Sequence, residues 1–170
     1  MSIVSQITAP LRLASTLVRR LFIGIAPLKP SVEIASQAAL ARQVDATVLH
    51  QIRAGRTHRF IDILFVTVDD RVFCRRYTYG ERSWRDVFLR DPDGQVALNR
   101  RIVDIEARVP EDLDTINPRV NAAYEAALQR IGANWMLAGA VEQRAMDSTM
   151  EITVSPPGRT ASPGRSSDRR

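Results

Sequence analysis

The stretch RVFCRRYTYGERSWRDVF, residues 71–88, brings arginines, tyrosines and a tryptophan together where a strand pattern gives way to a helical one. Its first half alternates like a strand, so Arg75 and Arg76 point to opposite faces and one of them faces the covered side. A buried guanidinium without a partner is costly, and a phosphate would satisfy it through two parallel hydrogen bonds. These residue types favour a ligand that combines a phosphate with a flat ring system.

The second half of this stretch predicts a short helix that adds phosphate contacts. Ser83 is the expected N-cap, and Asp86 at the third helical position resembles the partner residue of a capping box. Free backbone N–H groups at a helix start attract phosphate, and Arg82 and Arg85 add positive charge beside them. Trp84 is expected on the inner face of this helix.

The same arginines also fit a purely structural role in local salt bridges. The carboxylates available as partners are those of Asp62, Glu81 and Asp86. Spacing alone favours such salt bridges over phosphate binding, so the residues by themselves leave both interpretations open.

Metal and thiol chemistry are not favoured by the sequence. Cys74 is the only cysteine, which excludes an intrachain disulfide, and its position within a strand pattern predicts a buried apolar side chain. His50 and His58 are the only histidines and have no partner at metal-ligand spacing. We therefore expect no metal site, and no side chain stands out as an obligatory catalytic acid or base.

The strands that position these residues are visible as apolar runs. The run 59–68, the tight turn at Asp69 and Asp70, and the run 71–79 together predict an antiparallel hairpin. Further strands are expected at 95–99, 100–109 and 149–154.

Two longer helices are expected from apolar periodicity and end signals. One covers residues 36–54 and ends at Gly55. The other begins with Asn117 as N-cap and Pro118 at the first helical position, and it ends at Gly132.

The remaining segments complete an α+β fold. Residues 91–94, DPDG, predict a turn in which Gly94 tolerates a positive φ, and residues 133–146 are expected to be helical. Short hairpin-linked strands without βαβ alternation indicate a mostly antiparallel sheet or a small barrel.

The sequence divides into three regions. Residues 1–30 form an expected amphipathic N-terminal helix and linker, residues 31–155 one folded domain, and residues 156–170 a disordered basic tail. The apolar side chains of residues 2–25 have helical spacing, but three arginines interrupt them, so a transmembrane helix is not expected. The pattern fits a peripheral membrane contact, or packing against the protein's own domain or a partner subunit.

Charge is concentrated at the two ends of the chain. The net charge is +5, of which residues 1–32 carry +4 and residues 155–170 carry +3. Residues 33–154 have 16 basic and 18 acidic side chains, a net −2, which argues against a nucleic-acid partner. Within this body, residues 53–101 carry +4 and residues 104–154 carry −5, so an anion site is expected in the former.

Three runs of the sequence resemble an uncharacterised bacterial family. They are HRFIDILFVTVDDRVFCRRY, RSWRDVFLRDPDGQVALNRRIVDIEARV and INPRVNAAYEAAL, and the resemblance spans about residues 57–155. That family is grouped with the split β-barrel flavin-binding proteins, which include pyridoxamine-phosphate oxidases and deazaflavin-dependent nitroreductases. The resemblance implies a mostly antiparallel split β-barrel with flanking helices.

The resemblance also implies a cofactor and a site. It implies FMN or a deazaflavin as cofactor, a cytoplasmic oxidoreductase acting on a small molecule, and a homodimer. A cofactor-free binding or dimerisation module is the alternative, because the Gly-Lys-Ser-like phosphate loop of many deazaflavin-dependent members is replaced here by YGERSW. Carried over by position, the cofactor-binding residues are Arg75, Arg76, Arg82, Ser83, Trp84 and Arg85.

Overall fold

The computed structural model describes residues 34–47, 50–77, 79 and 83–156. The predictions for the N-terminal helix at 2–25 and for the tail beyond Pro156 lie outside these residues. Among the helices that are described, none is long and apolar enough to cross a membrane.

Seven strands form one sheet in which every pairing is antiparallel. Along the sheet their order is β2-β1-β5-β6-β7-β4-β3. The strands are β1 (His50–Ala54), β2 (Ile61–Ile63), β3 (Phe65–Val68), β4 (Arg71–Cys74), β5 (Asp93–Leu98), β6 (Arg101–Arg108) and β7 (Met150–Val154).

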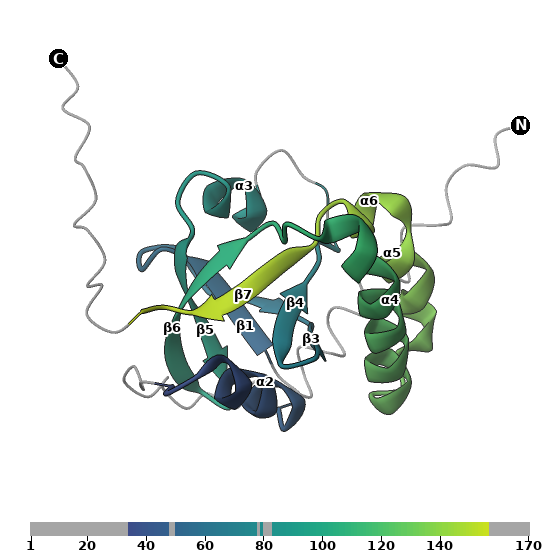
Figure 1. Cartoon of the computed structure of the whole chain (residues 1–170), viewed down its shortest axis with the longest axis horizontal. Coiled ribbons are helices and arrows are strands. Elements are labelled where there is room, and N and C mark those ends of the chain that lie inside the picture. The colour runs from purple at the N-terminus through teal and green to yellow at the C-terminus, as the bar shows by residue number, and fades with distance from the viewer. Residues whose placement is uncertain (1–33, 48–49, 78, 80–82, 157–170) are drawn as a thin grey trace, which may run out of the picture.

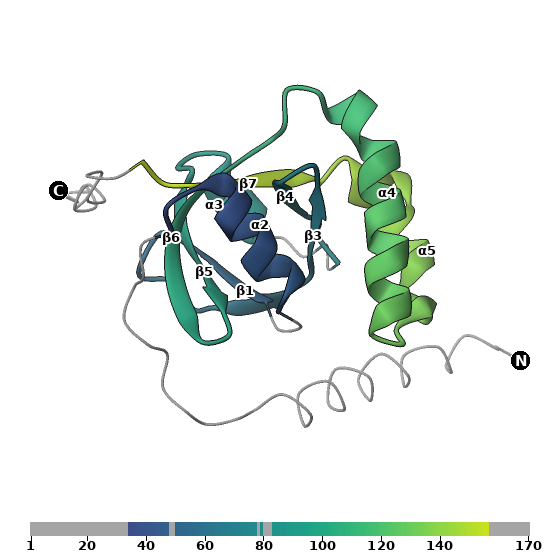
Figure 2. The ribbon, with the colours of Figure 1, turned by 60° about the horizontal axis from the view of Figure 1, so that its bottom comes forward.

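The two ends of this sheet are joined by a single run of chain. β2 and β3 are separated only by Leu64, yet β2 pairs with β1 at one end of the order and β3 pairs with β4 at the other. The sheet therefore bends into a nearly closed barrel (Figures 1 and 2). This confirms the expected α+β class, a mostly antiparallel barrel with flanking helices.

The helices cover both ends and one side of the barrel. Figure 1 shows α2 and α3 at opposite ends, and α4, α5 and α6 grouped along one side. Their bounds are α2 (Gln37–Asp45), α3 (Trp84–Phe88), α4 (Leu113–Arg130), the 3₁₀ turn η1 (Asn134–Met136), α5 (Leu137–Val141) and α6 (Gln143–Met146).

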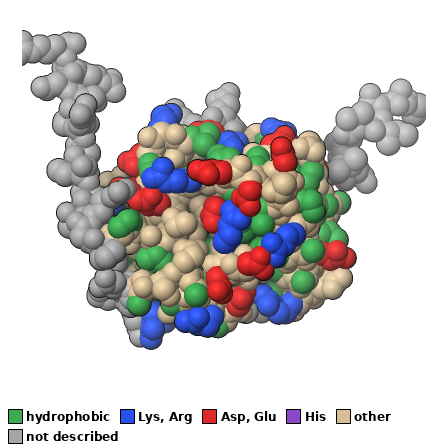
Figure 3. Space-filling model, in the orientation of Figure 1, with side chains coloured by type: hydrophobic (Ala, Val, Ile, Leu, Met, Phe, Trp, Pro, Cys, Tyr) green, Lys and Arg blue, Asp and Glu red, His purple; other side chains and the backbone are tan. Residues whose placement is uncertain are grey.

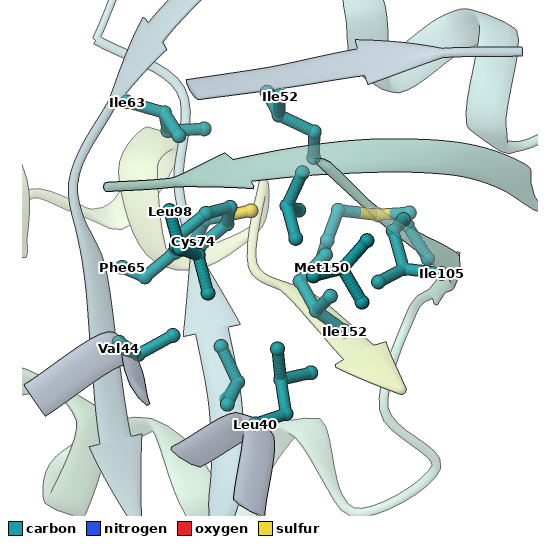
Figure 4. Close-up of a cluster of buried hydrophobic side chains, with 14 of the residues drawn as sticks. Leu40, Val44, Ile52, Ile63, Phe65, Cys74, Leu98, Ile105, Met150 and Ile152 are labelled. Atoms are coloured by element: carbon teal, nitrogen blue, oxygen red, sulfur yellow. The ribbon is translucent and has the colours of Figure 1, made fainter. Parts of the chain in front are cut away.

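The barrel interior is filled with apolar side chains. Leu40 and Val44 of α2 enter it from one end and Phe88 of α3 from the other, where they meet strand residues such as Ile105 and Met150. Figure 4 shows α2 side chains directed at those of the strands. A second cluster packs between β3, β4 and α4, and contains Val66, Phe73, Val120, Tyr124 and Leu128.

Two hairpin turns have positive φ at both central residues, and the first of them was predicted from the sequence. Asp69 and Asp70 connect β3 to β4 with φ of 49° and 62°, as the predicted tight turn requires. Asn99 and Arg100 connect β5 to β6 with φ of 47° and 67°. Positive φ at both central residues matches the right-handed strand twist, and Asn and Asp tolerate it.

The helix expected over residues 36–54 is too long. Ser36 caps the helix as expected, with Oγ accepting a hydrogen bond from the N–H of Ala39 at 3.2 Å. However, α2 ends at Asp45, and residues 50–54 form β1, which pairs with β5 along its whole length. Gly55 therefore follows a strand rather than a helix, with φ of 59°.

The start of α4 and the role of Gly94 also differ from the predictions. α4 begins at Leu113, so Asn117 is a buried interior residue rather than an N-cap, and Pro118 lies inside the helix. Packing of Ile116 against the barrel extends the helix toward its N-terminus. Gly94 lies within β5, opposite Ile105, and its φ is not positive, so it is not a turn residue.

His50 connects β1 to β3 by a side-chain hydrogen bond at the place where the barrel closes. Its Nδ1 accepts the backbone N–H of Phe65 at 3.1 Å, so Nε2 carries the proton and donates to the carbonyl of Val44 at 3.1 Å. Burial lowers the pKa of His50, against the raising effect of the carbonyls of Val44 and Thr47. The nearby charges of Arg130 and Asp45 act in opposite directions.

The lowered pKa of His50 predicts that the protein loses stability on mild acidification. The unfolded chain binds a proton near the ordinary pKa of 6.5, whereas the folded chain binds it only at lower pH. The free energy of unfolding should therefore fall as pH drops below about 6.5. We expect the urea midpoint to fall between pH 7.5 and 5.5, and the fall to be smaller in His50→Gln. The control is His58→Gln, because His58 is exposed. If the urea midpoint of His50→Gln falls with pH as steeply as that of the unchanged protein, His50 is not the residue responsible.

Candidate functional site

The buried arginine of the 71–88 stretch is Arg75. β4 ends at Cys74, and the next side chain is fully buried between the barrel and the α4–α6 helices. The alternation argument correctly predicted that one of the two adjacent arginines faces a covered side. It did not predict what covers Arg75, because the partners come from residues 42 to 74 positions away.

The hydrogen bonds described for Arg75 all go to neutral acceptors. Nε donates to Thr149 Oγ1 at 2.9 Å, Nη2 to Asn117 Oδ1 at 2.8 Å, and Nη1 to Asn121 Oδ1 at 2.6 Å and the carbonyl of Ala140 at 2.8 Å. These partners are neither the phosphate nor the carboxylates considered from the sequence. The side chain instead ties β4 to α4, α5 and the start of β7.

Two tyrosines stand beside this network. The Tyr124 ring lies 5.2 Å from Arg75 Cζ, and its hydroxyl donates to the carbonyl of Leu64 at 3.1 Å. The Tyr77 hydroxyl is buried and has no hydrogen-bond partner of good geometry among the described residues. Burial lowers the pKa of Arg75, and it raises the pKa of both tyrosines. The guanidinium stays charged, so the protein holds a positive charge in its interior without a neighbouring carboxylate as hydrogen-bond partner.

Arg76 points away from the side of the chain that buries Arg75, and it belongs to a second group of residues. We call this group the junction cluster: Arg76, Tyr79, Ser83, Arg85, Asp86 and Arg144. Within it, Arg144 Cζ lies 3.7 Å and Arg76 Cζ 5.2 Å from the centre of the Tyr79 ring. Burial and then Glu142 raise the pKa of Tyr79, while Arg144 and Arg76 lower it. The backbone N–H of Arg76 donates to Ser148 Oγ at 2.9 Å, which joins the end of β4 to the α6–β7 connection.

α3 borders the junction cluster, and its start confirms the predicted cap. Ser83 Oγ accepts from the N–H of Asp86 at 3.2 Å and donates to the Asp86 carboxylate at 2.7 Å. Hydrogen bonding by Ser83, and then the charges of Arg76 and Arg85, lower the pKa of Asp86. Because α3 has only five residues, we assign no phosphate affinity to its N-terminus.

Arg85 and Trp84 occupy different environments on α3. Arg85 Nη2 donates to the carbonyl of Asp147 at 3.2 Å, whereas its Nε is buried with no hydrogen-bond partner among the described residues. Trp84 packs against the barrel core and meets Phe88 edge-on, with ring centroids 6.1 Å apart. Trp84 therefore helps to close the end of the barrel.

The structure brings together only part of the predicted site. Arg76, Ser83 and Arg85 converge around Asp86, while Arg75 lies in the interior and Trp84 faces the core; Arg82 lies outside the described residues. The sequence missed Arg144 in the junction cluster and the polar residues that hold Arg75. These come from the alanine-rich 133–146 region, from α4 and from the start of β7, where no local pattern marks them.

A separate groove of about 360 Å³ lies on the outer face of the barrel, where β6 leads into the loop before α4. Arg71 crosses it and donates to Glu151 and to Asp112, each at 2.7 Å. These two carboxylates raise the pKa of Arg71. Because its charges are already paired with one another, the groove offers no obvious anion site.

Metal and thiol chemistry find no support in the described part of the chain. It contains no group of three or more histidine, cysteine or carboxylate side chains placed to hold a metal ion. Cys74 is fully buried, as the sequence predicted, and burial raises the pKa of its thiol.

The fold and the junction cluster together define an α+β protein with a nearly closed antiparallel barrel and a basic-aromatic surface group where β4 leads into α3. Among solved structures, the chain is similar to a candidate pyridoxamine 5'-phosphate oxidase from Listeria innocua. The TM-score is 0.44 and the sequence identity 12%, over 71% of this chain and 93% of that one. No family model and no curated protein matches the sequence.

Proposed function

We propose that this chain binds FMN or a deazaflavin at the junction cluster and acts as a cytoplasmic oxidoreductase on a small molecule. The observation that carries the proposal is a group of arginines: Arg76 and Arg144 lie against the Tyr79 ring, and Arg76 and Arg85 are close enough to Asp86 to lower its pKa. The buried charge of Arg75 lies beside this group. Guanidinium groups bind phosphate oxygens in pairs and stack on flat rings. One cluster thus offers both kinds of contact that a phosphorylated ring cofactor needs.

The residues of the cluster have distinct roles in this proposal. Arg76, Ser83 and Arg85 contact the phosphate, and a phosphate oxygen accepts a hydrogen bond from the buried Nε of Arg85. Arg82, which the sequence also predicts as a phosphate ligand, lies outside the described residues. Trp84 packs on the barrel core, so in this proposal it supports α3 and does not contact the cofactor. Arg75 does not touch the cofactor; it fixes the end of β4 and the chain around Thr149, next to Ser148.

Because the barrel interior is filled, the proposed cofactor site lies on the outer surface. Side chains from both barrel ends and from the strands occupy the interior. A cofactor at the junction cluster would leave one face open to solvent, and in the proposed homodimer a second copy of the chain covers it. The cofactor supplies hydride transfer when bound, and the protein supplies binding and orientation.

The alternative function is a cofactor-free barrel that serves as a binding or dimerisation module. Its supporting observation is that protein acceptors, rather than a ligand, satisfy the buried guanidinium of Arg75. In that case substitutions at Arg75 and Arg76 lower stability and change no small-molecule affinity.

Cofactor titration separates the two functions. We expect FMN or a deazaflavin to bind with a Kd in the micromolar range or below, which is a binding free energy of about −8 kcal/mol. Absorbance and fluorescence of the cofactor measure the binding. Arg85→Ala should weaken binding about 10- to 100-fold, because a hydrogen bond to a charged group contributes roughly 1.5–3 kcal/mol. The control is Arg90→Ala, since Arg90 is exposed just beyond α3. Absence of binding by all cofactors at ~100 μM would reject the proposal and favour the cofactor-free module.

A further inference from the structure

Asp86 is the carboxylate of the junction cluster, and it lies among the groups that bind the phosphate in the proposed function. Its Oδ2 accepts a hydrogen bond from Ser83 Oγ at 2.7 Å, and its backbone N–H donates to the same serine oxygen at 3.2 Å. The Ser83 hydrogen bond, and then the charges of Arg76 and Arg85, lower the pKa of Asp86, so its carboxylate is ionised at neutral pH. A phosphate bound by Ser83 and these arginines therefore meets a fixed negative charge.

A phosphate has to share its hydrogen-bond donors with Asp86. The hydroxyl of Ser83 has one hydrogen to donate, and this hydrogen goes to Asp86. Arg85 is partly engaged as well, because its Nη2 donates to the carbonyl of Asp147 at 3.2 Å. The buried Nε of Arg85 has no hydrogen-bond partner among the described residues and can donate to one phosphate oxygen. These contacts suit a phosphate that presents few charged oxygens.

The charged side chains around this site nearly balance. Four are positive and three are negative, which gives a net charge of +1: Arg75, Arg76, Arg85 and Arg144 against Asp86, Glu142 and Asp147. Glu81 and Arg82 lie outside the described residues, and their opposite formal charges leave the sum unchanged. On the face of the molecule that Figure 3 shows, basic and acidic side chains are intermingled, so no wide basic area adds to this charge there. The positive charge of the site therefore matches one negative charge on a ligand.

Phosphate groups differ in charge according to their linkage. A monoester such as FMN carries nearly two negative charges at pH 8, because its second pKa is about 6, whereas a diester carries one. The repulsion between Asp86 and the phosphate doubles with the second charge. The cost of removing an ion from water rises more steeply still, with the square of its charge. A nearly balanced site does not offset both costs for a doubly charged group.

We propose that Asp86 determines which phosphate the junction cluster accepts, and that the site favours a singly charged phosphodiester over a doubly charged monoester. The inference rests on the proposed function, because it concerns the same phosphate contacts. Asp86 acts through its charge and does not contact the ring system. The ligand class that it selects is a flat ring system joined through a phosphodiester to a further group.

Three flavins that differ only at the phosphate test this role. They are riboflavin, the methyl ester of FMN and FMN, whose charges at pH 8 are 0, about −1 and about −2. Flavin fluorescence gives the Kd of each for the full-length protein and for Asp86→Asn. We expect Asp86→Asn to strengthen the binding of FMN about 10-fold and of the methyl ester about 3-fold, and to leave riboflavin unchanged, because the repulsion is proportional to the phosphate charge. In the unchanged protein, the methyl ester should bind at least about 3-fold more tightly than FMN.

The matched control is Asp70→Asn, which removes the same charge at the opposite end of β4. Asp70 is exposed, and β4 alone spans about 13 Å between it and the junction. This variant should change none of the three affinities. Asparagine keeps the shape of aspartate, and its amide oxygen still accepts from Ser83, so the fold of Asp86→Asn should persist; circular dichroism verifies this.

The outcomes separate this inference from the proposed function. An equal effect of Asp86→Asn on all three flavins would overturn the inference, since a charge effect must follow the phosphate charge. Tighter binding of FMN than of its methyl ester by the unchanged protein would also overturn it, and the proposed function would stand. If riboflavin binds as tightly as both phosphorylated forms, or if none binds at ~100 μM, the junction cluster is not a phosphate site and the inference fails together with it.

Discussion

Replacing Arg75 by alanine is expected to cost about 3–5 kcal/mol of unfolding free energy, one of the two largest effects for a single residue in this chain. The substitution removes the Arg75 donor from the buried oxygens of Asn117 and Thr149 and from the half-buried oxygen of Asn121. Hydrogen bonds to a charged group contribute more than neutral ones. Removing the buried charge offsets only part of this loss. Urea unfolding followed by circular dichroism gives the value directly.

Two further substitutions decide what Arg75 contributes. Arg75→Met keeps much of the volume but removes the donors, and we expect it to be nearly as unstable as Arg75→Ala. The control is Arg119→Ala, because Arg119 pairs with Asp69 at the exposed surface and such pairs contribute at most about 1 kcal/mol. If Arg75→Met were as stable as the unchanged protein, the hydrogen-bond network would contribute nothing net, and the account given above would be wrong.

The second large effect is expected for Gly94→Ala, at about 3 kcal/mol. A Cβ at this position would lie 2.5 Å from Phe88 Cε1 and 2.6 Å from the carbonyl oxygen of Arg53. Phe88 fills the end of the barrel, and the Arg53 carbonyl belongs to β1, so neither moves without disturbing the core. The urea midpoint should fall, and the near-ultraviolet circular dichroism of Trp84, which packs on Phe88, should change.

The controls for Gly94 separate crowding from the general effect of adding a methyl group. Gly139→Ala adds the same atom where nothing lies within 4 Å, and it should be neutral or slightly stabilising because alanine favours a helix. Phe88→Leu combined with Gly94→Ala should recover only part of the loss, since the Arg53 carbonyl still obstructs the methyl group. Full recovery in the double variant would show that the backbone contact is unimportant.

The sequence predicts the parts of this fold whose signals are local. The Asp69–Asp70 turn, the Ser83 cap and the burial of Cys74 each depend on neighbours along the chain, and all three are confirmed. The helical spacing of Val44, Val48 and Ile52 predicts a helix that continues through residues 50–54. Pairing of β1 with β5, about 45 residues away, overrides that pattern.

The candidate site was less predictable because it is assembled from distant segments. Strand alternation indicated that Arg75 or Arg76 must be buried, but nothing local identifies Asn117, Asn121 or Thr149 as partners. Pro118 even suggested that Asn117 lies at a helix start, where it would cap the helix. Packing of α4 on the barrel places Asn117 in the helix interior, and its side chain is then free to accept from Arg75.

The closure of the barrel limits how this chain can associate with others. The run from Ile61 to Val68 contains both β2 and β3, which are the two end strands of the sheet, and both are short. At the place where these ends meet, the N–H of Phe65 already donates to His50. A chain that recruits partners by adding a strand needs a longer exposed edge. Within the described barrel, strand edges therefore offer little backbone for a partner, and most of the accessible surface is formed by side chains. The same closure protects the apolar β2–β3 run from the edge-to-edge stacking that starts amyloid-like aggregation.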